Sequence, residues 1–113
     1  MHVCGRLSSG SLNVLSRIKR VNVLSLEFAG SPANIDLLPK STPKKIGVGC
    51  TRSSIASFNE LTFLEQSLEV INNVASKIGR ENIAYIHPDC GLRRTSLDLT
   101  TMILKNISLK ENR

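Results

Sequence analysis

The chain has 113 residues, 41% of them hydrophobic, which is enough for one small domain with a modest core spanning residues 1–113. Its net charge is +6, but the basic residues are scattered in short pairs without interleaved aromatic residues, so we expect no nucleic-acid partner. The sequence has no apolar run of about 18 residues and no signal-peptide pattern at its start, so we expect a cytoplasmic protein without membrane contacts.

Four short segments have the apolar composition of strands: 1–4, 21–28, 45–50 and 82–87. Their apolar runs are continuous rather than alternating, which is typical of a parallel sheet covered on both faces. The sequence therefore predicts parallel strands with helices between them.

A helix is predicted after each strand. The first, around Leu12, has apolar residues about one turn apart. The second is short, with Ser31 as its N-cap and Pro32 as its first residue. The third and longest is predicted over 62–78. Its apolar face is expected to consist of Leu64, Leu68, Ile71, Ala75 and Ile78.

Capping-box spacings mark the starts of the two longer helices. Thr62 with Glu65 has this spacing at the third helix. The last helix is predicted to start near Ser96, where Thr95 and Asp98 have the same spacing.

Four consecutive β-α units with parallel strands predict an α/β fold, either a β/α barrel or an open doubly wound sheet. A complete eight-stranded barrel needs about 250 residues, so this chain has room for about half of one. The chain also begins inside a predicted strand. We therefore expect a truncated chain.

The first candidate ligands are His2 and Cys4, at the start of the chain. On a strand, residues i and i+2 point to the same face, close enough to share one metal ion. An H-x-C pair alone is a weak signal, and a solvated histidine beside a packing cysteine is the simpler interpretation of the pair.

Further candidates lie at the ends of the later strands. Glu27 ends the second predicted strand, and Cys90 follows the last one after a proline. Functional groups of β/α folds gather at these carboxyl ends, although a solvated strand-end glutamate is an equal alternative for Glu27. Cys50 also ends a strand, and spacing alone does not choose between Cys50 and Cys90.

Three widely spaced cysteines make a poor disulfide framework, and metal ligation or packing suits them better. One nitrogen, two sulfur and one oxygen ligand suit Zn²⁺. Zinc held by thiolates is a good activator of a substrate thiol, because it lowers the pKa of that thiol.

Four motifs occur in this order: HVCG at 2–5, LSLEFAGS at 24–31, GVGC at 47–50 and HPDCGLR at 87–93. Together they resemble the last third of the catalytic barrel of cobalamin-independent methionine synthases, most closely the short archaeal forms. The resemblance covers nearly the whole chain. It implies the C-terminal half of a (β/α)8 TIM barrel.

By this resemblance the zinc ligands are His2, Cys4, Glu27 and Cys90, and Cys50 is a packing cysteine. His87 is then a local substitution outside the ligand set. Asp89 either orients the loop around the site or stabilises a turn.

The resemblance also implies a homocysteine S-methyltransferase. The methyl donor would be a methyltetrahydrofolate polyglutamate or a methylcorrinoid protein. The groups that grip homocysteine come from the first half of the barrel in this family, so we expect the chain alone to be inactive and the missing N-terminal half to be its partner. A non-catalytic zinc-binding remnant, or a partner subunit of a split enzyme, is the alternative.

Overall fold

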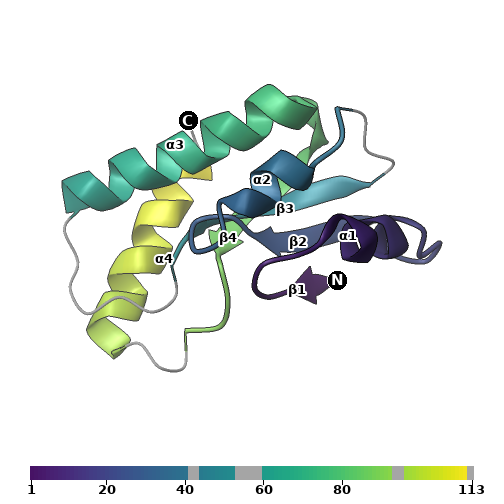
Figure 1. Cartoon of the computed structure of the whole chain (residues 1–113). Helices are drawn as coiled ribbons and strands as arrows, with labels where there is room; N and C mark the ends of the chain where they lie inside the picture. The colour runs from purple at the N-terminus through teal and green to yellow at the C-terminus, as the bar shows by residue number, and fades with distance from the viewer. Residues whose placement is uncertain (41–43, 53–59, 93–95, 112–113) are drawn as a thin grey trace.

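The computed structural model describes residues 1–40, 44–52, 60–92 and 96–111, which form an α/β architecture (Figure 1). The strands are β1 (His2–Val3), β2 (Val23–Glu27), β3 (Lys45–Thr51) and β4 (Ile83–Pro88). The helices are α1 (Ser9–Ser16), α2 (Ala33–Leu37), α3 (Glu60–Ile78) and α4 (Leu97–Glu111), with a 3₁₀ turn η1 (Arg80–Asn82) before β4. The strands form one parallel sheet in the order β1-β2-β3-β4, which confirms the predicted alternation and the parallel sheet.

Cross-strand pairing separates the two faces of this sheet. Leu26 of β2 pairs with Val48 of β3, and both belong to the hydrophobic core. One residue further on, Glu27 pairs with Gly49, and Gly49 pairs with His87. Successive residues of a strand point to opposite faces, so one face is apolar and the other is polar. The continuous apolar run of β3 therefore does not give the sheet two apolar faces, because its glycines extend the run in sequence without adding apolar side chains.

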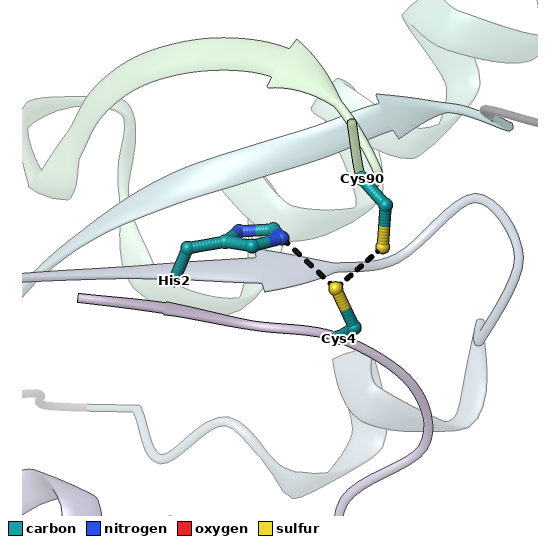
Figure 2. A group of neighbouring side chains, drawn as sticks. All are labelled: His2, Cys4 and Cys90. Atoms are coloured by element: carbon teal, nitrogen blue, oxygen red, sulfur yellow. Dashed lines mark hydrogen bonds between the residues drawn. The ribbon is translucent and has the colours of Figure 1, made fainter. Parts of the chain in front are cut away.

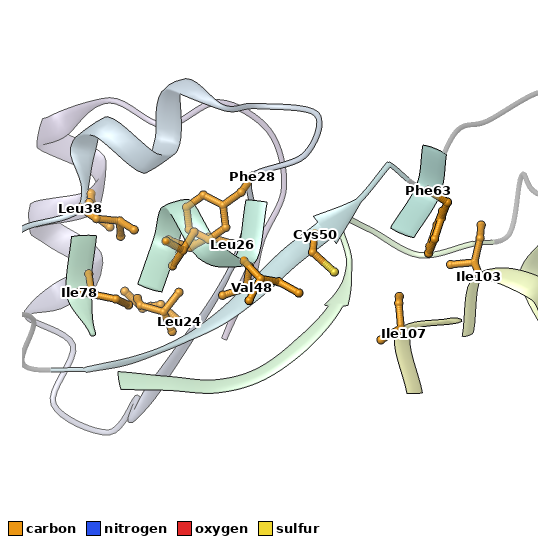
Figure 3. Close-up of a cluster of buried hydrophobic side chains, with 14 residues drawn as sticks. Leu24, Leu26, Phe28, Leu38, Val48, Cys50, Phe63, Ile78, Ile103 and Ile107 are labelled. Atoms are coloured by element: carbon orange, nitrogen blue, oxygen red, sulfur yellow. The ribbon is translucent and has the colours of Figure 1, made fainter. Parts of the chain in front are cut away.

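The core joins the apolar face of the sheet to the helices (Figure 3). Its buried members are Leu12, Leu24, Leu26, Phe28, Leu38, Ile46, Val48, Cys50, Phe63, Ile71, Val74, Ile78, Ile103 and Ile107. Full burial of one such aliphatic or aromatic side chain contributes roughly 1.5–3 kcal/mol, so this cluster is the main stabilising feature of the described residues. Among these residues, no helix is long and apolar enough to span a membrane.

Helix α3 is rotated relative to the predicted apolar face. Besides Ile71 and Ile78, its buried residues are Phe63, Ser67 and Val74. Ser67 is 2% exposed, and its hydroxyl bonds Thr51 Oγ1 at 3.1 Å and the Phe63 carbonyl at 2.8 Å. A satisfied hydroxyl at the centre of the buried face explains why hydrophobicity alone misplaced it. The predicted residues Leu64, Leu68 and Ala75 are half-buried at its edge.

The helix starts correct the predicted caps of α3 and α2, and they confirm the predicted start of α4 near Ser96. Helix α3 begins at Glu60, so Thr62 lies inside it and does not form the capping box. Helix α2 has Pro32 in the N-cap position, because the Ser31 hydroxyl instead donates to Glu27 Oε1 at 3.1 Å. At α4 the side chain of Ser96 accepts a bond from Leu99 N at 3.3 Å, and the predicted cap Thr95 lies outside the described residues.

Asn34 of α2 connects the two loops that flank the polar face. Its side chain is 1% exposed and donates to the carbonyls of Gly5 at 3.0 Å and Glu27 at 2.8 Å. Its Oδ1 accepts from Leu7 N at 2.8 Å. The loop after β1 is thus fixed against the carboxyl end of β2.

Replacing Asn34 by alanine should lower the free energy of unfolding by about 2–4 kcal/mol, because it leaves three backbone groups without their partner. Urea denaturation followed by circular dichroism measures this loss. Asn13→Ala, at an exposed position of α1, is the matched control and should cost less than about 0.5 kcal/mol. Equal losses in the two variants would contradict the role given to Asn34.

Candidate metal centre

The predicted ligands come from both edges of the sheet. His2 and Cys4 belong to β1 and the residues after it, and Cys90 follows β4, the strand at the opposite end of the order. Neighbouring strands are about 4.8 Å apart, so three steps across a flat sheet would separate β1 from β4 by about 14 Å. Yet the Sγ atoms of Cys4 and Cys90 are 2.7 Å apart. The sheet is therefore strongly curved, with the carboxyl ends of its edge strands brought together on the polar, concave side.

Three of the four predicted ligands form a compact group. Figure 2 shows the side chains of His2, Cys4 and Cys90 pointing toward one another. His2 Nε2 is 3.2 Å from Cys4 Sγ, and one ligand atom from each residue lies within 4.8 Å of the others. His2 and Cys4 are exposed and Cys90 is half-buried, so the group is open to solvent. One nitrogen and two sulfurs are a donor set that suits zinc.

Glu27, the fourth predicted ligand, lies beside this group but does not join it. Its Oε2 is 3.6 Å from Cys90 Sγ and accepts a bond from Gly5 N at 2.8 Å. Its Oε1 accepts from the Ser31 hydroxyl at 3.1 Å. The carboxylate is thus held at the rim of the group, with one oxygen in contact with a candidate ligand.

Cys50, the rival of Cys90, lies on the other face of the sheet. It is 1% exposed within the hydrophobic core, and its Sγ is 3.7 Å from the His87 carbonyl. A thiol in this position packs against apolar side chains and does not reach the group of His2, Cys4 and Cys90.

Two further polar side chains, those of Ser25 and His87, lie on the side of His2 away from Cys4. Ser25 Oγ is 2.8 Å from His2 Nδ1 and 2.8 Å from His87 Nε2. The rings of His2 and His87 also meet edge to face, with centroids 5.6 Å apart. Sequence reasoning placed His87 outside the ligand set and missed Ser25. A polar residue two positions before Glu27, in an otherwise apolar strand, was the available signal, because the two share one face.

Asp89 fixes the turn that follows β2. It is 3% exposed and accepts bonds from the N–H groups of Phe28 and Ala29, both at 3.2 Å, and of Gly30 at 2.7 Å. Burial raises the pKa of Asp89 to about 6, the bond from Gly30 opposes this rise, and the charge of Glu27 adds to it. Gly30 lies between both carboxylates, since a Cβ there would be 2.6 Å from Glu27 Oε1 and 3.0 Å from Asp89 Oδ2.

The electrostatics of the site favour the neutral forms of Cys90 and His2. Burial, followed by the neighbouring Cys4 thiol and the Glu27 carboxylate, raises the pKa of Cys90 to about 12. Burial, followed by the adjacent His87, lowers the pKa of His2. A bound cation would reverse this balance for the thiols, because a coordinated thiol is deprotonated. The donor set and its surroundings therefore fit a divalent, thiophilic metal.

Comparisons with known proteins agree on one family. The family model described as "Cobalamin-independent synthase, Catalytic domain" matches residues 1–110. The methionine synthase of Methanothermobacter thermautotrophicus is 35% identical over 111 residues, which cover 95% of this chain and 33% of that protein. Those of Methanothermobacter marburgensis and Methanocaldococcus jannaschii are 34% and 31% identical, each over 95% of this chain, and over 33% and 35% of their own lengths.

The chain thus spans about a third of the length of these curated relatives. No solved structure matches it. The match of the family model over nearly every residue, together with the identity to three archaeal proteins, settles the relationship. The chain belongs to the catalytic-domain family of the cobalamin-independent methionine synthases.

Proposed function

We propose that this chain carries the zinc site of a homocysteine S-methyltransferase that makes methionine, with His2, Cys4, Glu27 and Cys90 as ligands. The observation that carries the proposal is the convergence of His2, Cys4 and Cys90 within 4.8 Å from the two edges of the sheet. One nitrogen and two sulfurs at this separation are a donor set that suits zinc, and family membership supplies the chemistry.

Glu27 completes the set as its oxygen donor. Its Oε2 already lies 3.6 Å from Cys90 Sγ, which makes this carboxylate the oxygen donor beside the other three ligands. The bonds from Gly5 N and the Ser31 hydroxyl keep it near the site when it is not engaged. Two sulfurs, one nitrogen and one oxygen make a tetrahedral set for Zn²⁺.

When bound, zinc acts as a Lewis acid that lowers the pKa of a coordinated thiol, so that homocysteine reacts as its thiolate. The chain's own residues determine where this reaction takes place. Asp89 accepts bonds from Phe28 N and Gly30 N, and so the turn that directly follows Glu27 is held against the residue before Cys90. The homocysteine sulfur then takes the methyl group as the bond between that group and its donor breaks.

The substrate partners follow from the same proposal. Homocysteine is the methyl acceptor, and the donor is a methyltetrahydrofolate polyglutamate or a methylcorrinoid protein. We propose that the described strands are the C-terminal half of a TIM barrel, in which the curvature that brings Cys4 to Cys90 continues into the remaining strands. Turnover then requires the N-terminal half of the barrel as a partner. We propose that the protein acts in the cytoplasm.

Purified chain should contain about one zinc per molecule, measured by elemental analysis at known protein concentration. Cys4→Ser and Cys90→Ser should each lose most of it, because a hydroxyl is a poor replacement for a thiolate ligand. Cys50→Ser is the matched control and should keep its zinc, since that thiol lies in the core. A folded chain without zinc would mean that the four ligands are relics of a longer enzyme, and loss of zinc in the Cys50 variant would contradict the ligand set.

Homocysteine should change the thiolate-to-metal absorption of the cobalt-substituted chain, because its thiol adds a sulfur ligand to the site. Homoserine, which has a hydroxyl in place of the thiol, is the matched control and should leave the spectrum unchanged. Titration of both compounds into the same sample measures this difference. Equal responses would contradict recognition of the homocysteine thiol by the metal site of this chain.

A further inference from the structure

The polar face contains a chain of hydrogen bonds that ends at His2. It starts at the backbone carbonyl of Pro88, which bonds His87 Nδ1. The other nitrogen of that ring, Nε2, is 2.8 Å from Ser25 Oγ, and Ser25 Oγ is 2.8 Å from His2 Nδ1. His2 Nε2, at the far end, faces Cys4 Sγ at 3.2 Å. One series of contacts therefore links a fixed backbone group to the candidate metal site.

The donor and acceptor roles along this series follow from its first member. A carbonyl only accepts, so His87 Nδ1 carries the proton and, in the neutral ring, Nε2 is an acceptor. Ser25 therefore donates its hydroxyl proton to His87, and its oxygen accepts a bond from His2 Nδ1–H. In a neutral His2 the remaining nitrogen, Nε2, then holds a free lone pair.

That lone pair points at the thiol of Cys4, whose Sγ is 3.2 Å from His2 Nε2. A histidine ligates a metal through an unprotonated ring nitrogen, and the hydrogen bond made by its other nitrogen selects which one this is. Ser25 is 5% exposed, so water has little access to compete for its bonds. His2 itself is exposed, and without such a partner its ring would be free to turn and to exchange tautomers.

We propose that Ser25 and His87 are positioning residues which fix His2 in the tautomer protonated at Nδ1, with the Nε2 lone pair directed between Cys4 and Cys90. The inference rests on the proposed zinc site and identifies the residues that hold its histidine ligand in place. Neither Ser25 nor His87 contacts the metal in this assignment. They act through His2.

The tautomer is measured directly on the full chain without metal. Long-range proton–nitrogen correlation spectra of the ¹⁵N-labelled chain at about pH 8, where an ordinary histidine is neutral, identify the protonated ring nitrogen. We expect Nδ1–H for His2 in the unaltered chain and in Ser25→Thr, which keeps the hydroxyl. In Ser25→Ala we expect a mixture of the two tautomers.

Zinc affinity, measured by competition with a chelator, provides the second measurement. Ser25→Ala should weaken it about 10- to 100-fold, as is typical when the partner of a metal-bound histidine is removed, and Ser25→Thr should restore it. His87→Ala, at a half-buried position, should also weaken it and serves as the second variant if Ser25→Ala does not fold. Ser76→Ala, on the exposed side of α3, is the matched control and should change neither measurement.

The two measurements separate the inference from the function on which it rests. A His2 ring protonated at Nε2 in the unaltered chain would overturn the inference whatever the zinc result. An unchanged tautomer and affinity in Ser25→Ala would do the same. The expected tautomer in a folded chain that binds no zinc would instead reject the proposed function and leave the positioning of His2 intact.

Discussion

The curvature of the parallel sheet is the constraint on which the rest of the candidate site depends. Cys4 and Cys90 follow the strands at opposite ends of the order β1-β2-β3-β4, and only a coiled sheet brings their sulfurs within 2.7 Å. Right-handed strand twist and helices packed on one face bend a parallel sheet in this way. The small residues of β3 on the polar face, Gly47 and Gly49, leave the concave side room for the side chains of its neighbours.

Buried polar groups then set the loops at the open end of this curve. Asn34 attaches the loop after β1 to the end of β2, and Asp89 attaches the turn after β2 to the end of β4. Both side chains form hydrogen bonds with backbone groups. Without these side chains, the backbone groups would be shielded from water and have no hydrogen-bond partner. The positions of His2, Cys4 and Glu27 therefore depend on two residues that are not themselves candidate ligands.

Much of this arrangement could be predicted from the sequence. Each strand and helix was predicted near its observed position, because apolar composition and turn residues are local signals. Strand geometry placed His2 and Cys4 on one face, although the pair alone favoured a solvated histidine beside a packing cysteine. The choice between Cys50 and Cys90 needed a family resemblance, although alternation along β3 already groups Cys50 with Ile46 and Val48, which face the core.

Other features depend on contacts between distant segments, which local patterns do not contain. The rotation of α3 reflects the bond between Ser67 and Thr51. The missing cap of α2 has a nearer cause, because the Ser31 hydroxyl bonds Glu27 only four positions earlier. Ser25 acquires its role only when the side chains of His2 from β1 and His87 from β4 reach its hydroxyl. Ser67 and Ser25 look ordinary in sequence because their side-chain partners are distant: Thr51 is 16 positions from Ser67, and His87 is 62 positions from Ser25.

The closeness of Cys4 and Cys90 also has a thermodynamic consequence for the chain. These residues are 86 positions apart, so an ion that holds both sulfurs is a cross-link around most of the sequence. A covalent link closing a loop of this length removes unfolded-state entropy equivalent to about 4–5 kcal/mol at room temperature. A metal clip acts on the same entropy, within the limit set by its own affinity. The ion would thereby cross-link the residues after β1 to those after β4. The same metal–ligand bonds would then serve both the chemistry of the site and the stability of the fold.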